Sequence, residues 1–267
     1  MNFSVLMSVY SGESPEYLRQ SLQSLADQTL RARELVLVED GPLGNELLHT
    51  INGYRKTLNI RSVKLPQNVG LGIALNQGLL KCSCDLVARM DTDDIALPRR
   101  FEKQVDFMNS NPETAVSSAW VKEIDRDGRT FSTRRIPAGH EELLSFALKR
   151  SPISHPAAIF RKSAVMAVGG YPPLRKAQDY GLWANLLVNG YRADNLQEPL
   201  CLMRMDNKFD PGQSLKQLRN EWAMFRFQRQ IGFIGWPLFA RNVGIRCILR
   251  LSPAPVQRAL YRHARPL

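Results

Sequence analysis

The feature that most constrains the fold is the regular alternation of short apolar runs and amphipathic stretches in the first 110 residues. The apolar runs are partly β-branched and too short for helices, so each predicts a buried strand. They cover residues 3–9, 35–38, 60–65 and 86–90. Apolar residues at helical spacing follow, and they predict helices that begin near residues 15, 45, 71 and 98. This order predicts an α/β fold in which helices cover both faces of a mostly parallel central sheet.

Polar residues follow three of these predicted strands directly. Tyr10 ends the first, Asp40 ends the second, and Asp91 with Asp93 follows the fourth. Ligands of open parallel sheets bind beyond the carboxyl ends of the strands, so we expect these side chains to line one crevice. There Tyr10 could stack on a nucleobase and Asp40 could accept hydrogen bonds from a base or ribose. The structural alternatives are an ordinary loop tyrosine and an aspartate that starts the Asp-Gly-Pro turn.

The run Asp91-Thr92-Asp93-Asp94 is the strongest chemical signal in the chain. Three carboxylates in four residues repel one another unless a cation or a basic group joins them. Mg²⁺ and similar hard cations take oxygen ligands and share them with substrate phosphates. We therefore predict that Asp91 and Asp93 hold Mn²⁺ or Mg²⁺ against a diphosphate. The alternative is a solvated acidic turn before the helix that begins at Pro98.

Three further segments supply candidate site residues. The loop Asn68–Gly72 precedes a helix, and its backbone N–H groups could approach a phosphate or a ribose. Asp179 lies at the start of a predicted helix over residues 178–188 and could act as a general base toward an acceptor hydroxyl. A helix cap or a first-turn acid is the alternative for Asp179. His155, next to Pro156, could contact the acceptor or a phosphate, with a purely structural role as its alternative.

The second half of the chain is less regular and ends in a basic tail. Apolar runs predict strands over residues 114–121 and 157–160, and Asp127-Gly128 predicts a hairpin turn between strands. The net charge is +11, and eight arginines without an acidic residue lie from residue 222 to the end, so residues 1–221 carry only +3. Large apolar residues are interleaved with these arginines: Phe233, Ile234, Trp236, Leu238 and Phe239. This pattern predicts contact with an anionic membrane surface, and packing of a helical tail on the body is the alternative.

Several classes of protein do not fit the sequence. No apolar stretch is long enough for a transmembrane helix, and the first residues have neither the basic start nor the apolar core of an export signal, so we expect a cytoplasmic chain. Four scattered cysteines are typical of reduced thiols rather than of a zinc site. A nucleic-acid-binding protein would need a basic or aromatic platform in the nearly neutral body, so we predict no nucleic-acid partner.

Taken together, these segments resemble the bacterial family 2 glycosyltransferases with the GT-A fold, over residues 3–205. The matching segments are Ser4–Tyr10, Leu35–Gly41, Asn68–Leu79, Ala88–Asp94, Pro98–Phe101, Ser154–Pro156 and Gly169–Tyr171. The chain departs from the family at three places. Glu39 stands where the family has the first Asp of Asp-Asp-Gly, Gln178 stands where it has Glu, and Met203-Arg204-Met205 stands where it often has Tyr-Arg.

The resemblance implies a role for each site residue. The nucleotide-sugar would contact Ser8, Tyr10, Asp40, Asn68, Gly70, Asn76, Arg89 and Asp91. Asp91 and Asp93 would hold the metal, Asp179 would be the catalytic base, and His155, Gln178 and Arg204 would lie on the acceptor side. The implied reaction is a single displacement with inversion, in which the metal offsets charge on the departing nucleotide diphosphate.

The resemblance also implies substrates and location. The donor would be a UDP-sugar carrying a hexose or an N-acetylhexosamine, with UDP-galactose the leading candidate. The acceptor would be a saccharide on undecaprenyl diphosphate, as in O-antigen, capsule or exopolysaccharide synthesis at the inner face of the cell membrane. A sugar-nucleotide nucleotidyltransferase and a non-enzymatic nucleic-acid-binding protein are the alternatives. The former also uses a D-x-D and a nucleotide crevice, but a Gly-rich activating loop with Lys or Arg near the N-terminus is absent here.

The expected domain organisation follows from the same segments. Residues 1–210 would form the GT-A domain, with a nucleotide-binding half over 1–110 and an acceptor-binding half over 111–210. Residues 211–267, which begin at Pro211-Gly212, would form a basic, amphipathic, helical C-terminal extension.

Overall fold

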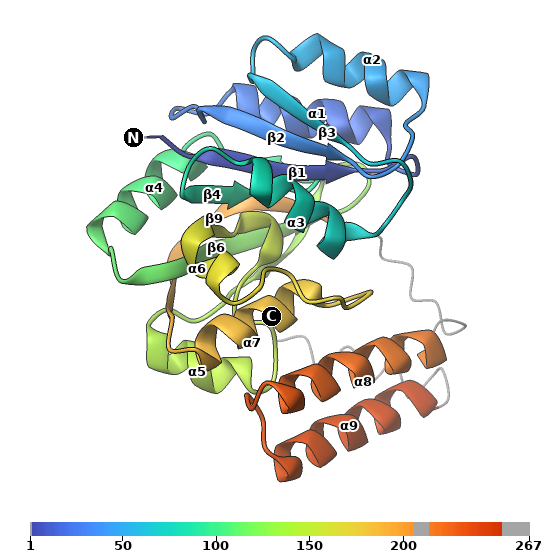
Figure 1. Cartoon of the computed structure of the whole chain (residues 1–267), viewed down its shortest axis with the longest axis vertical. Helices are drawn as coiled ribbons and strands as arrows, with labels where there is room; N and C mark the ends of the chain where they lie inside the picture. Colours follow the sequence, from blue (N-terminus) through green and yellow to red (C-terminus); the bar gives the residue numbers. More distant parts are fainter. Residues whose placement is uncertain (1, 206–213, 253–267) are drawn as a thin grey trace.

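The first four strands pair in parallel, as the sequence predicts. The computed structural model describes residues 2–205 and 214–252. In it β3, β2, β1 and β4 lie side by side in that order (Figure 1). Their bounds are β1 Ser4–Val9, β2 Glu34–Glu39, β3 Ile60–Lys64 and β4 Leu86–Arg89. Every residue of β1, β2 and β4 is buried, because helices cover both faces of this part of the sheet.

Four helices alternate with these strands and form the two covering layers. They are α1 Pro15–Ala26, α2 Asn45–Tyr54, α3 Leu71–Lys81 and α4 Arg100–Ser110. Successive side chains of β1 point to opposite faces: Met7 packs with residues of α1, α2 and α4, whereas Leu6 packs with residues of α3. Gly78 lets α3 approach the sheet closely, since a Cβ there would lie 2.5 Å from side-chain atoms of Leu6 and Val38.

The second half of the chain makes the sheet mixed. β8 (Ile159–Arg161) is antiparallel to both β4 and β6 (Thr114–Ile124), and β9 (Arg192–Arg204) runs parallel to β6. β5 (Ile95–Ala96) is antiparallel to β9. β7 (Thr130–Arg134) forms a hairpin with β6 at the predicted turn, where Gly128 has φ 83°. Parallel pairing is therefore confirmed for β1 to β4, while the strands added later also pair antiparallel.

The remaining helices of the body surround the end of the sheet formed by β6 and β9. α7 (Gln178–Val188) has the bounds that its apolar spacing predicts. The short turn η1 (His155–Ala157) precedes β8, so the strand expected from residue 157 begins two residues later. α5 (His140–Ala147) and α6 (Lys162–Ala167) were not predicted, because helices of so few residues present little more than one or two turns of apolar periodicity.

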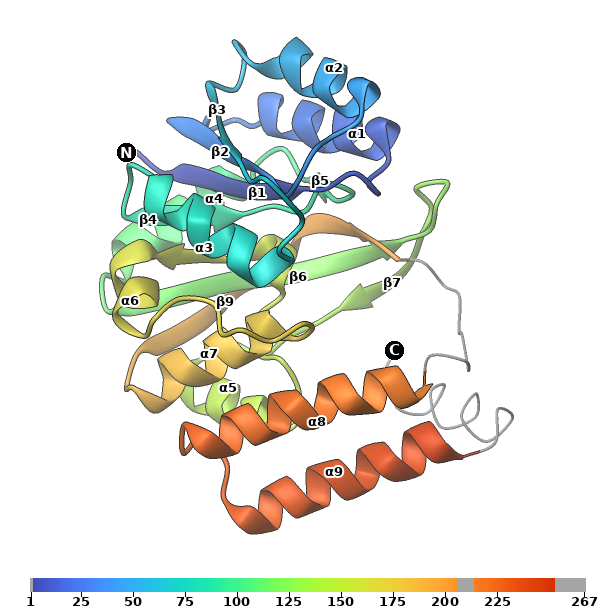
Figure 2. The ribbon, with the colours of Figure 1, turned by 45° about the vertical axis from the view of Figure 1, so that its right-hand side comes forward.

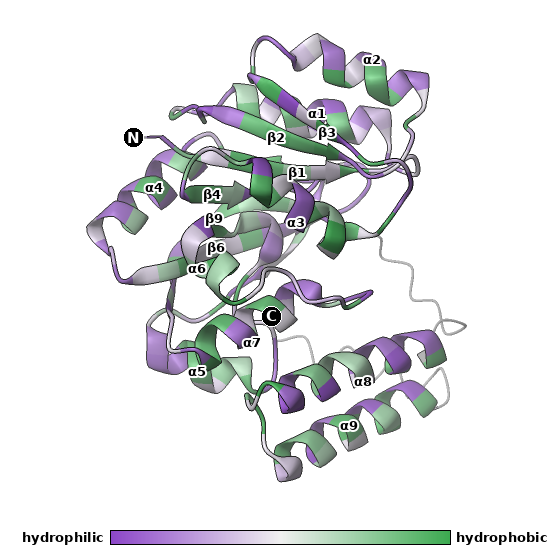
Figure 3. Cartoon of the chain, viewed as in Figure 1, coloured by the Kyte–Doolittle hydropathy of each residue, from purple (hydrophilic) through white to green (hydrophobic). Residues whose placement is uncertain are grey.

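The basic tail forms a helical hairpin at the end of the molecule opposite α1 and α2 (Figures 1 and 2). α8 (Ser214–Gln230) and α9 (Trp236–Leu251) pack side by side, and α8 also packs on α7. Figure 3 shows hydrophilic and apolar residues alternating along both helices. No helix of the described ranges is both long and apolar enough to cross a bilayer.

One expectation for the tail needs correction. Of the five large apolar residues expected at a lipid interface, Ile234 is buried and Phe233, Leu238 and Phe239 are partly buried in a cluster with Tyr180 of α7. Only Trp236 is mainly exposed, at 65%. Burial against the body removes these side chains from water without a membrane, so packing on the body, the alternative reading of the tail, describes this segment.

Candidate functional site

The loop after β4 is organised by an arginine that the solvent does not reach. Arg89 is fully buried and forms an ion pair with the Asp91 carboxylate, whose side chain is 29% exposed. Its Nη1 donates to the Leu6 carbonyl at 3.3 Å, and its Nε has no hydrogen-bond partner among the described residues. In this structure Arg89 holds Asp91 in place, and its expected contact with a nucleotide remains a prediction.

Four carboxylates gather at this loop. Burial and the nearby Asp91 carboxylate raise the pKa of Asp93 to about 6. Burial, then Asp91 and Asp93, also raise the pKa of Asp94. Glu13, from the loop after β1, belongs to the same group, since burial followed by the charges of Asp93 and Asp91 raises its pKa to about 7. Negative charge on these carboxylates is therefore costly, because burial and their mutual repulsion both favour the protonated forms.

The donor set of this cluster fits a hard divalent cation shared with a substrate. Among residues 2–205 and 214–252, no three or more His, Cys, Asp or Glu side chains converge to enclose a metal ion. Mg²⁺ is usually bound by one or two carboxylates together with substrate phosphates rather than by an all-protein cage. Asp91 and Asp93 supply two carboxylates for such an arrangement, and a cation would offset their repulsion.

Arg204, at the end of β9, fastens the acidic loop to the surrounding elements. Its Nε donates to the Asp93 carbonyl at 3.2 Å, and its backbone N–H donates to the Asp94 carboxylate at 2.8 Å. The guanidinium also donates to Gln20 at 2.9 Å and lies 4.0 Å from the centre of the Tyr17 ring. These contacts account for Arg204 as a residue that positions the loop, and its expected contact with an acceptor remains a prediction.

Asp40 also has a positioning role. One carboxylate oxygen accepts the Val69 N–H at 2.8 Å and the other accepts the Gly70 N–H at 3.1 Å. Asn68 donates to the Asp40 carbonyl at 3.4 Å. The loop before α3 is thus held against the end of β2, and Gly70, with φ 89°, is the N-cap of that helix.

Two residues at the end of β1 were also expected to contact the nucleotide. Tyr10 is 45% exposed, so part of its ring is accessible from the solvent, and its stacking on a nucleobase remains a prediction. Its ring lies over Gly12, where a Cβ would come within 2.5 Å of the ring carbon Cε2. Ser8 lies two residues earlier on β1 and is buried, at 8% exposure.

Asn76 connects α3 to the glycine-rich segment before α7. Its side-chain amide donates to the Tyr171 carbonyl at 2.9 Å, and its Oδ1 accepts the Tyr171 N–H at 2.8 Å. Gly170 has φ 77°, and a Cβ there would lie 2.5 Å from the Asn76 oxygen. The asparagine expected to contact the nucleotide-sugar therefore uses its side chain to fix the position of Tyr171.

His155 and Tyr171 form a buried pair in the middle of the site. The His155 Nε2 and the Tyr171 hydroxyl are 3.0 Å apart, and Trp183 of α7 packs beside the imidazole. Burial, then the charge of Arg89, lowers the pKa of His155 to about 4. His155 is therefore neutral near pH 7, so its expected contact with a phosphate could not be that of a cation.

Asp179 lies in the first turn of α7 but does not cap the helix. The N-cap is Ala177, in the left-handed conformation at φ 58°, and Asp179 is the second helical residue. Within the described ranges, no hydrogen bond or ion pair joins its half-buried carboxylate to another residue. Gln178 is buried instead and packs on α3, where a Cβ on Gly72 would lie 3.3 Å from its Cγ.

The buried pair connects the two acidic parts of the site. The negative charges of Asp179 and Asp91 both raise the pKa of Tyr171, after the larger effect of burial, and both also act on His155. Asp179 from α7 and Asp91 from the loop after β4 therefore both lie within electrostatic range of this buried pair, although 88 residues of sequence separate them. The site brings together a carboxylate pair suited to a cation and a separate carboxylate without a partner among the described residues.

Sequence reasoning missed three contributors to this site: Glu13, Tyr171 and Trp183. An acid in the loop after the first strand would have been a usable signal for Glu13, because that loop opens at the carboxyl edge of the sheet. Tyr171 and Trp183 gave no chemical signal, since an aromatic residue after Gly-Gly or within an apolar helix face is ordinary core.

Comparison with known proteins agrees with this geometry. Residues 4–169 match the model of a family described as glycosyl transferase family 2. The amylovoran biosynthesis glycosyltransferase AmsE of Erwinia amylovora is 38% identical over 267 residues, which covers 98% of this chain and 99% of that protein. An Escherichia coli protein is 36% identical, over 97% of this chain and 95% of its own length. That protein is named UDP-Gal:alpha-D-GlcNAc-diphosphoundecaprenol beta-1,3-galactosyltransferase.

The fold is shared with a solved glycosyltransferase. The crystal structure of S. aureus TarS residues 1–349 in complex with UDP superposes with a TM-score of 0.71, covering 96% of this chain and 77% of that one at 19% identity. The expected GT-A fold is thereby confirmed.

Proposed function

Since the chain belongs to glycosyl transferase family 2, we propose that it is an inverting, metal-dependent enzyme acting on lipid-linked sugars. It transfers a hexose or an N-acetylhexosamine from a UDP-sugar to a saccharide carried on a lipid diphosphate. The observation that carries the proposal is that Asp91 and Asp179, from different elements, both lie close enough to the buried His155–Tyr171 pair to act on its charge. The Asp91 carboxylate suits the donor diphosphate with its cation, and the Asp179 carboxylate suits the acceptor hydroxyl.

Each step of the transfer has a residue suited to it. Arg89 fixes Asp91, and Arg204 fixes the loop that contains Asp93. A divalent cation held by Asp91 and Asp93 would act as a Lewis acid toward the leaving diphosphate. Asp179 takes the proton of the acceptor hydroxyl as that oxygen bonds to the anomeric carbon and the bond to the diphosphate breaks. Attack from the face opposite the leaving group inverts the anomeric centre.

The substrates are proposed from the similar proteins. UDP-galactose is the leading donor, because the E. coli protein named for UDP-Gal is similar over nearly the whole chain. The same name gives a diphosphoundecaprenol-linked sugar as the acceptor. Its similarity, with that of AmsE, supports a role in the synthesis of a surface polysaccharide at the inner face of the cell membrane.

The experiment that tests the function measures products directly. The purified chain is incubated with a panel of UDP-sugars, synthetic lipid-diphosphate-linked saccharides and Mn²⁺, and products are identified by mass. We expect one UDP-sugar, UDP-galactose first, to add a single residue with inversion of the anomeric centre. Transfer from a non-uridine donor only, or retention of configuration, would refute the corresponding part of the proposal.

A substitution of Tyr10, the residue that follows β1, tests the proposed nucleotide site. Replacing the half-exposed Tyr10 by Ala should weaken UDP binding roughly tenfold, in line with the ~1–3 kcal/mol that base–aromatic stacking typically contributes. The melting temperature should hardly change, because the ring is 45% exposed. Calorimetric titration with UDP measures the affinity, and Phe131→Ala, a change at a comparably exposed ring (43%) on β7, is the control. Equal UDP affinity in the wild type and Tyr10→Ala would remove this assignment.

Membrane contact is proposed through exposed apolar side chains of the hairpin. Trp222 of α8 is 43% exposed, and Ile248 and Leu251 of α9 are 66% and 60% exposed. The arginines that begin at Arg226 would add attraction to anionic lipids of ~1 kcal/mol per residue near the surface.

A pair of serine substitutions tests this contact better than a truncation, which would uncover the cluster around Tyr180. Trp222→Ser with Ile248→Ser should reduce flotation with anionic liposomes at least tenfold, since each large apolar side chain contributes ~1.5–3 kcal/mol when buried. The control is Leu80→Ser with Met166→Ser, which removes two exposed apolar side chains (54% and 40%) from the body. If both variants float like the wild type, this surface does not bind membranes.

A further inference from the structure

We propose that a pocket between α9 and the segment after α5 binds a phosphate ester that carries a hydrocarbon chain. It is formed by residues that no proposed catalytic step uses. The inference goes beyond the proposed function, and its test measures binding rather than transfer, so the two can fail separately.

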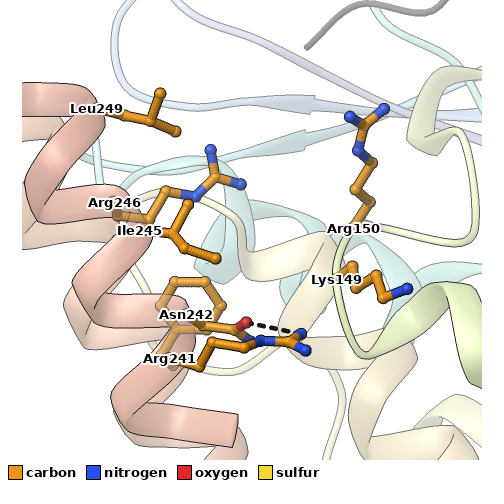
Figure 4. Close-up of a pocket in the computed structure, with 8 residues that line it drawn as sticks. Lys149, Arg150, Arg241, Asn242, Ile245, Arg246 and Leu249 are labelled. Atoms are coloured by element: carbon orange, nitrogen blue, oxygen red, sulfur yellow. Dashed lines mark hydrogen bonds between the residues drawn. The ribbon is translucent and has the colours of Figure 1, made fainter. Parts of the chain in front are cut away.

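The pocket has a volume of about 400 Å³ and two walls of positive charge. Lys149 and Arg150 line it from the segment after α5, and Arg241 and Arg246 line it from α9. Figure 4 shows Arg241, Ile245 and Arg246 projecting from α9 toward Lys149 and Arg150 across the pocket. The volume is within the ~300–1,000 Å³ that is usual for small-molecule sites.

The charge of the lining selects an anion. Among the described residues that line the pocket there is no Asp or Glu. Glu221 of α8, close to this lining, accepts from Arg250 at 2.7 Å and forms an ion pair with Arg246 at 3.9 Å. Like charges around one pocket repel, and an anion bound among them offsets that repulsion. Phosphate oxygens suit such a site because guanidinium groups bind them through charge-assisted and often bidentate hydrogen bonds.

The remaining wall is apolar and selects a hydrocarbon chain next to the phosphate. Phe225 of α8 is 2% exposed, while Ile245 is 47% exposed. Leu249, one turn further along α9, continues this wall. A free inorganic anion would leave this apolar surface in contact with water. A phosphate ester with a lipid chain would cover it and so remove that apolar surface from water.

The pocket also adjoins the element that carries the candidate base. Phe225 packs in the same apolar cluster as Tyr180, the residue after Asp179. The Tyr180 hydroxyl donates to the Ala147 carbonyl at the end of α5, two residues before Lys149. Asn242 of α9 donates to the Leu148 carbonyl at 3.1 Å. A phosphate-bearing lipid bound here would therefore be held against the elements that position the start of α7.

Two sources offer this chemistry, the headgroup of an anionic phospholipid and the diphosphate of a prenyl carrier. The test titrates the full chain with dihexanoyl phosphatidylglycerol, farnesyl diphosphate and inorganic phosphate, using calorimetry. We expect saturable binding of at least one chain-bearing probe, at least tenfold tighter than that of inorganic phosphate. Tighter binding of the phospholipid assigns the site to the membrane, and tighter binding of the prenyl diphosphate assigns it to the acceptor carrier.

A matched pair of variants separates a pocket from a diffuse basic surface. Lys149→Ala with Arg241→Ala removes one cation from each wall and should weaken binding at least tenfold. The control, Lys216→Ala with Arg219→Ala, removes the same two residue types from exposed positions of α8 outside the pocket. The affinity of this control variant for the lipid probes should stay within twofold of that of the wild type. Equal losses in the two variants, or binding of inorganic phosphate as tight as that of both lipid probes, would overturn the proposal.

Discussion

Replacing Asp179 by Asn should lower kcat by about 10²–10⁴-fold, the usual contribution of a general base. An amide keeps the size of the carboxylate but cannot accept the acceptor proton. UDP affinity should be nearly unchanged, because the carboxylates proposed for the donor side belong to the loop after β4. The measurement combines steady-state kinetics, calorimetric titration with UDP and thermal unfolding.

The structure makes this variant a clean test, because a capping role no longer competes for the same residue. Ala177 is the N-cap, and Asp179 is not hydrogen-bonded to another described residue. As a first-turn acid, Asp179 would contribute only ~0.3–1 kcal/mol through the helix dipole. Glu46→Gln is the matched control, since Glu46 is a first-turn acid of α2, whose N-cap also lacks a side-chain hydrogen bond. Near-normal turnover in Asp179→Asn would leave the residue with the helix-dipole role alone.

The sequence predicted those strands whose local apolar pattern matches their burial in the folded sheet. Buried parallel strands are continuous apolar runs, and for that reason β1, β2 and β4 could be recognised. β9 could not, because Asn195, Gln197 and Pro199 interrupt its apolar pattern. The register shifts of β9 against β6, near Ala119 and Trp120, accommodate that interruption and appear only once the partner strand is known.

The candidate site was predictable at the level of residue type and strand end, and not at the level of partners. A carboxylate after a strand gives the position of Asp91, but nothing local indicates that Arg89 would be fully buried beneath it. The sequence did not indicate that the side chains of Asp40 and Asn76 would hold the backbone of Gly70 and Tyr171, and their expected ligand contacts remain predictions. Long-range hydrogen bonds of this kind depend on how elements pack, which the spacing of residues in one segment does not contain.

The tail illustrates the same limit for surfaces. Apolar residues between arginines suit a lipid interface and a helical hairpin equally well, because both bury one face and leave the charges in water. Ile234 and Phe239 belong to the apolar cluster around Tyr180, so part of the apolar surface of the hairpin is buried within the protein. What remains for a partner is the smaller outer set that includes Trp222 and Ile248.

The second large effect is expected from substitution of Asp93, and it includes a change in stability that is measured without substrate. Replacing Asp93 by Asn should make the metal-free protein more stable than the wild type while lowering kcat/KM by about 100-fold or more, because a metal Lewis acid typically supplies several kcal/mol. The metal-free variant should be more stable because Asp93 is close to the carboxylates of Asp91 and Glu13. Removing one partly buried like charge relieves repulsion of ~1 kcal/mol or more.

Addition of Mn²⁺ should reverse this order of stability. A ligand that binds only the folded state adds ~2.7 kcal/mol at 100 times its Kd, so the melting temperature of the wild type should rise with Mn²⁺. That of Asp93→Asn should rise much less, because one of the two proposed ligands has lost its charge. EDTA should abolish transfer by the wild type, and Mn²⁺ or Mg²⁺ should restore it.

Asp127→Asn is the control for the measurements of stability and of activity, since it makes the same chemical change at an exposed position of the β6–β7 turn. It should match the wild type in stability, in the response to Mn²⁺ and in turnover. Full transfer in EDTA would remove the metal from the reaction. An equal rise in melting temperature for the wild type and Asp93→Asn would instead show that Mn²⁺ binds elsewhere, because a cation held by Asp91 and Asp93 cannot be indifferent to the loss of one of its two charged ligands.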